Sequence, residues 1–517
     1  MIATLNEKRE SHEPEMPAAQ SVSGQSEHRS SVNTQFALAL TLAAYCGVIL
    51  VGVSHHEPWA DEAQAWLLSR DLPYRYLVFH QIAYDGVPPL WPSILWVASH
   101  WLHLPYASMN WIGGICAIAG CWFFCRYSPF PLWVRVLFPF TYFMAFQYAV
   151  VARPYVLLPL CVFAAAHYFA DAERRPWRFI GAVSALSLLC AHGLMIAVGL
   201  VAARVCYSFR TWSQLAPAPK KKLFAALIVF ALVLAFVAFI NWPPSDYMFA
   251  RLDRPVRNGE NFGFGILPRD LSVAFLGSAI PSAMFLAVVG AWCACRRRFL
   301  PFVLPMVLVL GFCVRVFGNL WHGGALTLAA MAALWIAWPL PGKCSPQLQR
   351  GLNLLLLVGL ACLLAIQIYW AGSTLAMDYS HPYSGSLDAA NFLHSVGADA
   401  RSTCAFTFYS VAIQPYFPEN IFENWPPGEA FWRWQQGNRN DLNCTQVKWV
   451  VVPNASSLPV AQSWFQEKDR ALRSFGYVPA HVSPGSMFFE GRVVDPADFI
   501  IYESPQWPTA PGEPAEK

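Results

Sequence analysis

The run between residues 222 and 241 reads KLFAALIVFALVLAFVAFIN. After its first lysine it contains no charged side chain, and its length matches the roughly 20 residues that an α-helix needs to cross the hydrocarbon core of a bilayer. Hydrocarbon offers no hydrogen-bond partner to a peptide group, so such a segment must satisfy its backbone internally as a helix. Comparable runs recur from Phe36 to Met377. The sequence therefore predicts an α-helical polytopic membrane protein.

The composition of the chain supports this prediction. Of its 517 residues, 56% are hydrophobic and 13% are charged, whereas about a quarter of the residues of a soluble protein are charged. The formal net charge is +4, and no block of like charge resembles a nucleic-acid-binding arm. We therefore expect a lipid bilayer and no nucleic acid among the partners.

Basic residues in short loops stay on the cytoplasmic side of a membrane, so their positions predict the topology. The basic clusters are the N-terminal tail, Arg126 with Arg135, Arg174 to Arg178, Arg204 to Lys222, Arg296 to Arg298, and Lys343 with Arg350. All of them fall inside if the proline-rich segment 88–104 lies at the interface as an amphipathic helix and does not cross. The eleven predicted spans are then 36–53, 109–125, 133–151, 155–170, 178–191, 193–206, 222–241, 271–294, 299–317, 323–340 and 352–372. The stretch 178–206 is short for two crossings, so one of its helices is expected to be broken or partly inserted.

Three regions follow from this topology. Residues 1–35 are polar and are expected to form a disordered cytoplasmic tail ahead of a first apolar run that is retained as an anchor. Residues 36–375 form the transmembrane module, with outer loops at 54–108 and 241–270. Residues 376–517 are expected to form a small extracytoplasmic α/β domain, because helix-like stretches (386–396, 458–475) alternate there with strand-like ones (403–409, 447–452, 486–489, 499–502). We expect the protein in a bacterial inner membrane.

The sequence around each cysteine indicates whether it can form a disulfide. Most of the 14 Cys lie in apolar runs, where they behave as small hydrophobic residues. Only Cys404 and Cys444 lie in the polar C-terminal region, where an oxidising compartment allows a disulfide. Two free thiols remain an equal alternative.

An acidic pair opens the first outer loop. The sequence HHEPWADEAQAW places Asp61 and Glu62 just beyond the first predicted span, and carboxylates beside a bilayer are costly unless they are solvated, paired or used. On a helix, adjacent side chains point about 100° apart, so one carboxylate can act as a base while the other orients it. The alternative is an ordinary solvated loop with a helix-capping acid.

Cations are expected at the same face. Arg153 stands alone between apolar runs, and a guanidinium is well shaped to hold a phosphate through two hydrogen bonds. His192 interrupts another apolar stretch, and His322 follows Arg315 at the outer end of a span. A snorkelling arginine and buried structural histidines would explain each residue singly. Together with the acidic pair, however, they provide a base and phosphate-binding groups, which transfer from a phosphate-linked sugar donor requires.

At these residues the sequence resembles the GT-C superfamily of membrane glycosyltransferases, in the branch of the protein O-mannosyltransferases and the lipid A aminoarabinose transferase. The resemblance rests on short motifs that occur in order along residues 36–372, namely WADEAQAW, DGVPPLWPSILW, ARPYVLL, AHGLM and LWHGGALTLAAMAALWIA. It implies a GT-C-like fold and inverting transfer of a hexosyl or pentosyl group from a polyprenyl-phosphate sugar donor to a lipid, glycan or protein acceptor.

The resemblance also implies roles for single residues. Asp61 would be the general base, with Glu62 supporting it, and Arg153, His322 and, less directly, His192 would lie at the donor phosphate. Members of the branch often carry Lys or His directly before the Pro-Pro, whereas this chain has Val87 there and Asp85 two residues earlier. Asp85 therefore joins the candidate donor site, and further phosphate-binding charge is expected from Arg251, Arg254 or Arg257. Asp61, Glu62 and Asp85 carry oxygens that suit a divalent cation, but this branch is not generally metal-dependent, and no cofactor is predicted.

Two other functions fit parts of the pattern. A transporter or flippase of lipid-linked sugars would also need phosphate-binding cations, but it would not need a base beside them. A non-catalytic envelope assembly protein would depend on the C-terminal region and not on Asp61 or Arg153.

Overall fold

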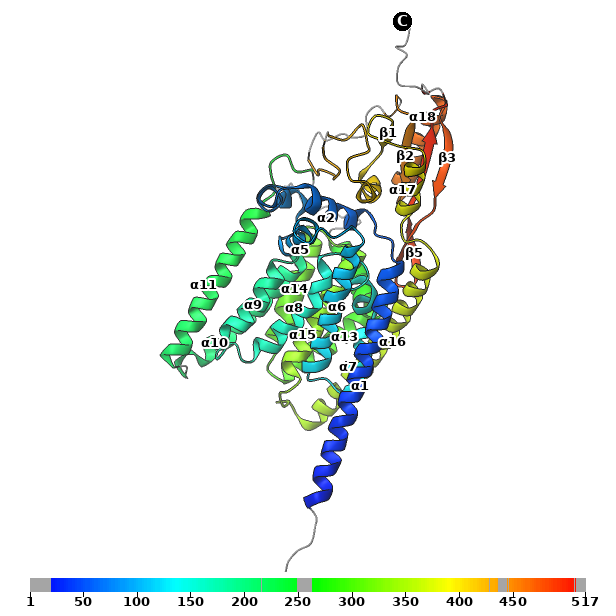
Figure 1. The fold of residues 1–517 in the computed structure, drawn as a ribbon. Coiled ribbons are helices and arrows are strands. Elements are labelled where there is room, and N and C mark those ends of the chain that lie inside the picture. Colours follow the sequence, from blue (N-terminus) through cyan, green and yellow to red (C-terminus); the bar gives the residue numbers. More distant parts are fainter. Residues whose placement is uncertain are drawn as a thin grey trace, which may run out of the picture.

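The protein is described here by a computed structural model, which covers residues 20–214, 216–248, 263–426, 428–435, 444, 446–505 and 507. Within these ranges, six helical stretches are long and apolar enough to cross a membrane, or seven if one bent pair counts as a single span. The six stretches are Val32–His55 of α1 (Gln20–His55), α6 (Ser108–Tyr127), Ala191–Arg210 of α10 (Ala191–Thr211), α11 (Pro217–Ile240), Leu320–Ala337 ending in α15 (Gly323–Ala337), and α16 (Pro346–Ser380). The chain is thus a multi-pass helical membrane protein (Figure 1).

The remaining predicted spans are shorter than expected, so the count of eleven is not confirmed. Helices α8 (Leu158–Phe169) and α9 (Pro176–Ser187) have 12 residues each, and α14 (Leu300–Arg315) has 16. At 1.5 Å per residue, a 12-residue helix covers only about 18 Å of the about 30 Å hydrocarbon core. The predicted span 271–294 is divided between α12 (Leu267–Ala274), which follows the 3₁₀ turn η6 (Phe264–Ile266), and α13 (Ala279–Cys295), with a bend of 76° between them.

The predicted helix over 133–151 is wrong as one continuous element. The structure has α7 (Leu132–Leu137), a 3₁₀ turn η2 (Phe138–Phe140), a π-helical turn η3 (Phe143–Gln147), an irregular stretch, and a 3₁₀ turn η4 (Pro154–Leu157) that leads into α8. Pro139 lies in the first break and Pro154 in the last, and proline removes a helix hydrogen bond and clashes with the preceding turn. The irregular stretch carries Arg153 and is buried among protein side chains, which is where non-helical backbone is tolerated in a membrane protein.

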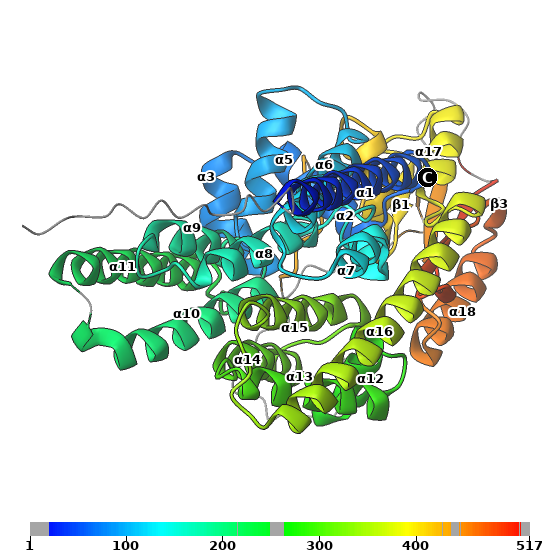
Figure 2. The same cartoon turned by 90° about the horizontal axis from the view of Figure 1, so that it is seen from below.

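Helix α15 lies at the centre of the bundle, and every one of its residues is buried. Its sequence is rich in Gly and Ala, which lets neighbouring backbones approach closely. At Gly324, an added Cβ atom would lie 2.5 Å from Phe143 and from Tyr148. In the view along the bundle, α15 lies between α8 and α10 on one side and α13 and α16 on the other (Figure 2).

Short helices cover one end of the bundle, which we call the α2 end. They are α2 (Ala60–Asp71), α3 (Tyr74–Tyr76), the π-helical turn η1 (Leu77–Gln81), α4 (Ile82–Asp85) and α5 (Leu90–His100). Helix α5 corresponds to the segment 88–104 for which we predict a helix that does not cross. Among the described residues it is not one of the candidate spans.

Basic clusters gather at the opposite end, which we call the basic end. Tyr207 donates a hydrogen bond to the carbonyl of Arg297, and Arg204 forms an ion pair with Glu173. The connection between α10 and α11, which includes the 3₁₀ turn η5 (Trp212–Gln214), lies there as well (Figure 1). The basic residues near 174, 204–210 and 296–298 therefore share one end, in agreement with the predicted single side.

Residues 386–503 form a C-terminal α/β layer above the α2 end (Figure 1). Its main sheet has the order β1-β2-β6-β3, with β1 (Thr403–Ala405) parallel to β2 (Trp449–Asn454), and β6 (Asp498–Glu503) antiparallel to both β2 and β3 (Val478–Ser483). A hairpin of β4 (Ser486–Phe489) and β5 (Arg492–Pro496) is separate from this sheet. The helices are α17 (Ser386–Ser395), the 3₁₀ helix η8 (Phe408–Tyr416) and α18 (Pro459–Ser474). The predicted helices 386–396 and 458–475 are thus found, whereas β3 and β5 were not predicted, and residues 408–409, expected in a strand, begin η8.

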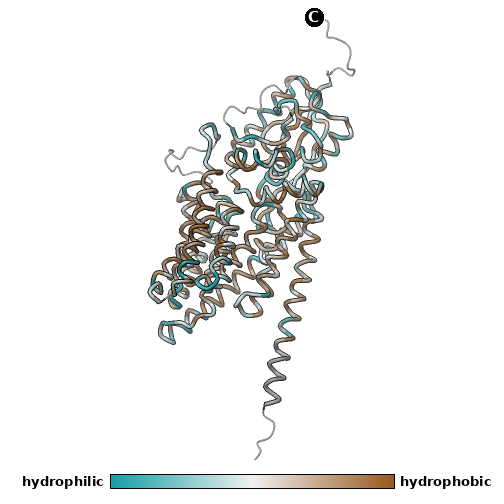
Figure 3. Tube along the Cα trace, turned by 60° about the vertical axis from the view of Figure 1, so that its left-hand side comes forward, coloured by the Kyte–Doolittle hydropathy of each residue, from teal (hydrophilic) through white to brown (hydrophobic). Residues whose placement is uncertain are grey.

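The layer shares the core of the bundle and also has a smaller core of its own. Phe488 and Phe489 of β4 belong to the same buried cluster as the membrane helices. A second cluster gathers around β2 and includes Val450, Val452 and Tyr502. Apolar residues dominate the helical bundle, whereas polar and apolar residues alternate in the layer (Figure 3).

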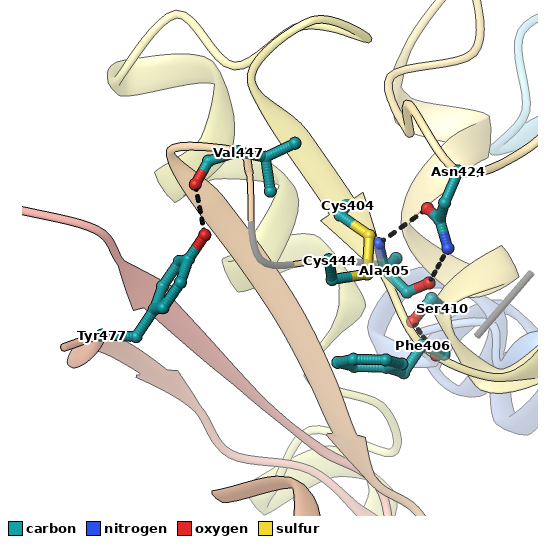
Figure 4. Close-up of a disulfide and its surroundings, with 8 residues drawn as sticks. All are labelled: Cys404, Ala405, Phe406, Ser410, Asn424, Cys444, Val447 and Tyr477. Atoms are coloured by element: carbon teal, nitrogen blue, oxygen red, sulfur yellow. Dashed lines mark hydrogen bonds between the residues drawn. A yellow bond between two sulfur atoms is a disulfide. The ribbon is translucent and has the colours of Figure 1, made fainter. Parts of the chain in front are cut away.

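Two disulfides are present in the described part of the chain. Cys404 in β1 bonds to Cys444, which lies five residues before β2 (Figure 4). Next to it, the side-chain amide of Asn424 accepts a hydrogen bond from the amide of Ala405 and donates one to its carbonyl. This resolves the alternative left open by the sequence in favour of a pair. The second disulfide, Cys295–Cys344, was not predicted, because Cys295 ends an apolar helix and gives no sign of a partner 49 residues away.

The N-terminal tail differs from the expectation where it can be described. Residues 1–19 lie outside the described residues, whereas residues 20–35, expected to be disordered, continue α1 as helix.

Candidate active site

The candidate site lies at the α2 end, where the connection between α1 and α2 meets the irregular stretch before η4. Helix α2 starts at Ala60, so Asp61 and Glu62 both lie in its first turn. Anionic side chains are favourable there because the unpaired N–H groups of the first turn carry partial positive charge. The two carboxylates nevertheless point to different surroundings, as expected for adjacent residues on a helix.

Asp61 meets Arg153 in an ion pair. Their Oδ2 and Nη2 atoms are 2.9 Å apart, and the side chains are 28% and 17% exposed. Arg153 has an extended backbone directly before η4, which aims its side chain back toward α2. Burial raises the pKa of Asp61 more than the charge of Arg153 lowers it. Such a carboxylate is a stronger base than a free aspartate.

The guanidinium of Arg153 has binding capacity left. It lies 5.9 Å from the ring of Trp59 and 5.5 Å from the ring of Tyr155, so two aromatic faces flank it. Its Nη1 is buried and, among the described residues, has no hydrogen-bond partner. A buried donor without a partner costs free energy that a ligand can recover. The arrangement suits an anionic ligand bound beside Asp61.

Glu62 is fully buried, and its carboxylate bonds to groups other than Arg153. Its Oε1 accepts a hydrogen bond from the amide of Ala152 at 2.6 Å, and its Oε2 accepts one from the amide of Trp59 at 3.2 Å. The same Oε2 lies 3.2 Å from Nε2 of His56, whose Nδ1 lies 3.0 Å from Asp378. Glu62 therefore bonds to buried groups of the protein and fixes the backbone at Trp59 and Ala152.

Asp85 ends α4 beside the site. Gln81 donates a hydrogen bond to it at 3.1 Å, and Gln64 of α2 lies 3.5 Å away. Burial raises the pKa of Asp85 to about 7, although these two amides lower it. Gln64 also pairs through both amide atoms with the backbone of Trp432, at 2.8 and 2.9 Å. The C-terminal layer thus contacts the helix that carries Asp61.

His192 and His322 lie together behind Arg153. Their ring centroids are 4.1 Å apart, and both rings are buried. The ring of Tyr155 lies 6.2 Å from His192, 5.8 Å from His322 and 5.5 Å from the guanidinium of Arg153, so it is next to all three groups. The Nδ1 of His322 accepts the amide of Asn319, whereas Nδ1 of His192 has no hydrogen-bond partner among the described residues.

The sequence-predicted residues are thus brought together in part. Asp61 and Arg153 are in contact, His192 and His322 are in contact, and Tyr155 connects the two pairs. Asp85 is held by Gln64, three residues after Asp61 on α2, and Glu62 is directed inward. Arg251, Arg254 and Arg257 lie outside the described residues. In the described ranges, no group of three or more His, Cys, Asp or Glu side chains is arranged to hold a metal ion.

Sequence reasoning missed four residues of this region. His56 stands in the quoted HHEPWADE motif, and a histidine among three nearby acids is a signal that was available. Asp378 is an acid at the end of an apolar helix, which is a signal of the same kind. Tyr155 stands in the quoted ARPYVLL motif, directly after Arg153 and Pro154, but was given no role, and Trp432 gave no signal because aromatic residues are common throughout the chain.

Comparison with known proteins gives a relative in structure and none in sequence. No protein-family model and no curated protein sequence matches the chain. The structure is similar to the crystal structure of ArnT from Cupriavidus metallidurans bound to undecaprenyl phosphate, with a TM-score of 0.54 and 11% sequence identity. The similarity covers 90% of this chain and 98% of that one. The chain therefore has an ArnT-like fold, which agrees with the fold that the resemblance found in the sequence implies.

Proposed function

We propose that the chain is an inverting glycosyltransferase that moves a sugar from a polyprenyl-phosphate donor to an acceptor hydroxyl. The observation that carries the proposal is the contact of Asp61 with Arg153, in which a carboxylate of raised pKa lies against a guanidinium with an unused buried donor. The fold shared with a protein whose structure holds undecaprenyl phosphate supports the choice of donor.

The chemistry assigns one task to each group. The donor phosphate binds at Nη1 of Arg153, where charge-assisted hydrogen bonds stabilise it. As the acceptor oxygen attacks C1 of the sugar, the C1–O bond to the phosphate breaks, and its electron pair stays on the polyprenyl phosphate. Arg153 stabilises that leaving group. Asp61 takes the proton of the acceptor hydroxyl. Attack from the face opposite the phosphate inverts the configuration at C1.

The two histidines and Asp85 are assigned supporting tasks. His192 and His322 lie next to Tyr155, which flanks the guanidinium of Arg153, so both histidines are assigned to the donor side of the site. The Nδ1 of His192, which has no hydrogen-bond partner among the described residues, is available to the sugar or the phosphate. Asp85, with a pKa of about 7, is available on the α4 side of Asp61 to bind a hydroxyl of the donor or the acceptor.

The proposed setting is a bacterial inner membrane, with the N-terminus cytoplasmic and the C-terminal α/β domain of residues 376–517 extracytoplasmic. The gathering of basic residues at the end opposite α2 supports this orientation, because basic loops stay inside. The acceptor is then an extracytoplasmic lipid, glycan or protein.

The test is transfer of radiolabelled sugar from polyprenyl-phosphate sugars to a membrane extract by the purified protein in nanodiscs. We expect labelled acceptor with the wild type and a loss of about 10²- to 10⁴-fold with Asp61→Asn, since this range is typical of removing a general base. Asp71→Asn is the matched control, because it changes the same side chain at the other end of α2, where Asp71 pairs with its neighbour Arg70. Wild-type transfer with Asp61→Asn would overturn the proposal.

The same variants separate the rival functions. A transporter or flippase would move the lipid-linked sugar across liposomes with Asp61→Asn as well as without it, and would label no acceptor. An assembly protein would tolerate Asp61→Asn and Arg153→Ala and would lose its function on removal of residues 378–517.

A further inference from the structure

A sealed cluster of three ionisable side chains lies directly behind the Asp61–Arg153 pair. His56, Glu62 and Asp378 are at most 2% exposed in their side chains, and the imidazole lies between the two carboxylates. Nδ1 is 3.0 Å from Asp378 and Nε2 is 3.2 Å from Glu62. Only the doubly protonated ring donates from both nitrogens. The two carboxylates raise the pKa of His56 to about 10 against the lowering effect of burial.

Glu62 connects this cluster to both halves of the proposed catalytic pair. It accepts the amide of Trp59, two residues before Asp61, and the amide of Ala152, the residue directly before Arg153. One carboxylate therefore holds the two backbone segments from which the base and the phosphate-binding group project. The distance between those groups depends on where Glu62 lies.

Asp378 connects the cluster to the rest of the molecule. It lies in the last turn of α16, the helix that leads into the C-terminal α/β layer, and it is 322 residues from His56 in the sequence. The ring of Tyr383, just beyond α16, packs on His56 with centroids 4.7 Å apart. The imidazole thus lies where α1, α2 and α16 meet, and it contacts side chains of α2 and α16.

We propose that His56 is a positioning residue, which holds Glu62 so that Asp61 and Arg153 keep a catalytic spacing, with Asp378 as its anchor. This inference rests on the proposed function. His56 touches no reacting atom. Its imidazole bonds to both buried carboxylates and places positive charge between them, so the Glu62 carboxylate is fixed where it accepts both amides.

The proposal predicts a distinctive pattern among charge variants. In His56→Gln, Glu62 and Asp378 lose the cation between them, so the two carboxylates repel each other and the hold on Ala152 weakens. We expect kcat to fall about 10- to 100-fold, since misplacement of reacting groups by about 1 Å has effects of this size, and the donor KM to rise by a smaller factor, because the guanidinium of Arg153 is retained. In His56→Gln/Asp378→Asn, only Glu62 remains charged, so kcat should recover by about 10-fold relative to His56→Gln.

The experiment combines steady-state transfer kinetics with hydrogen–deuterium exchange of the folded protein in nanodiscs. Peptides that contain Trp59 and Ala152 should exchange faster in His56→Gln than in the wild type and should regain protection in the double variant. His55→Gln is the matched control, because His55 is adjacent and exposed. It should leave both kinetics and exchange unchanged.

Each outcome decides the question. A His56→Gln protein with wild-type kcat and exchange, or a double variant no better than His56→Gln, overturns the positioning role. A loss of kcat that matches a loss of folded protein, measured by the thermal midpoint, also overturns it. If the wild type transfers no sugar, the proposed function fails, and the exchange pattern still tells whether His56 holds the Glu62 clamp.

Discussion

Two groups of charges lie side by side at the start of α2, and they differ in what surrounds them. The Asp61–Arg153 pair is partly exposed, and one of its donors has no partner among the described residues. The His56–Glu62–Asp378 cluster is closed to solvent. Its imidazole bonds to both carboxylates, and Glu62 also accepts two backbone amides. A site that binds a ligand keeps hydrogen-bonding groups free for it, whereas a cluster that fixes the backbone has its hydrogen-bonding groups already paired. We therefore expect changes in the first group to affect activity and changes in the second to affect stability as well.

The largest effect on stability is expected from Glu62→Ala. Removing one partner of a buried charge cluster leaves an uncompensated charge, which costs about 3–5 kcal/mol. Asp61→Ala removes a partly exposed partner and should cost no more than about 1 kcal/mol. Thermal or denaturant unfolding in detergent measures both. Equal losses from the two variants would remove the contrast between the groups.

A pH titration of stability sharpens the same comparison. Two carboxylates raise the pKa of His56 to about 10 in the folded protein, whereas an unfolded histidine has a pKa of about 6.5. The folded state therefore keeps a proton that the unfolded chain releases. The stabilisation is complete below about pH 6.5 and is lost as the pH rises through about 10, with an amplitude of up to a few kcal/mol.

The difference between the wild type and His56→Gln isolates this contribution from other groups that titrate at high pH. The free energy of unfolding of the wild type should decline relative to the variant as the pH rises from 7 to 10. Parallel curves for the two proteins would show that His56 does not carry the proton.

The sequence predicted the open pair better than the closed cluster. Asp61 and Arg153 were expected at one face because short motifs and basic loops orient the spans, and they are in contact, although their roles stay predictions. Glu62 was expected to support Asp61 in catalysis. The position of two neighbours on a helix gives the angle between their side chains, but it does not tell which of them faces the protein interior. The position of Asp378 at the end of an apolar helix was a local signal, but its contact with His56, 322 residues away, leaves no pattern in the sequence.

The fold was predictable to a similar degree. Hydropathy identified the long helices such as α11 and α16, since an apolar run of that length has few alternatives. It did not reveal the breaks between α7 and α8, where prolines and a buried irregular stretch replace a predicted helix. The segment between Pro139 and Pro154 carries Arg153, so the part of the fold that was hardest to predict is also the part that contributes to the candidate site.

Arg153→Lys tests the open pair through binding. Lysine keeps the charge but lacks the planar fork that holds a phosphate through two hydrogen bonds. We expect the donor KM to rise about 10-fold, which corresponds to about 1.4 kcal/mol. Arg70→Lys is the matched control on α2. A larger effect of Arg153→Lys on stability than on KM would argue that Arg153 is a structural partner of Asp61 and not a phosphate ligand.

The smallest effect is expected from Glu57→Gln, one residue from His56. Glu57 accepts the amide of Leu387 at 2.6 Å and the hydroxyl of Ser386 at 3.1 Å, so it caps α17 of the C-terminal layer. Glutamine keeps a carbonyl acceptor, and the favourable effect of a charge at a helix N-terminus, about 0.3–1 kcal/mol, is outweighed by the cost of burying that charge. Burial raises the pKa of Glu57 to about 7. Its ionised form is therefore disfavoured in the folded protein, and the wild type loses stability relative to the variant as the pH rises from about 4.5 to about 7.

Unfolding measured at pH 5 and at pH 8 checks this sign. Sugar transfer at pH 8 should stay within about twofold of the wild type, since the hydrogen bonds of Glu57 go to α17 and not to Asp61 or Arg153. Three neighbouring acids would then show three behaviours. Asp61 would govern transfer, Glu62 stability and catalytic spacing, and Glu57 only the attachment of α17. If Glu57→Gln reduced transfer as strongly as Asp61→Asn, the acids of this segment would act as one group, and the division between an open pair and a closed cluster would have to be abandoned.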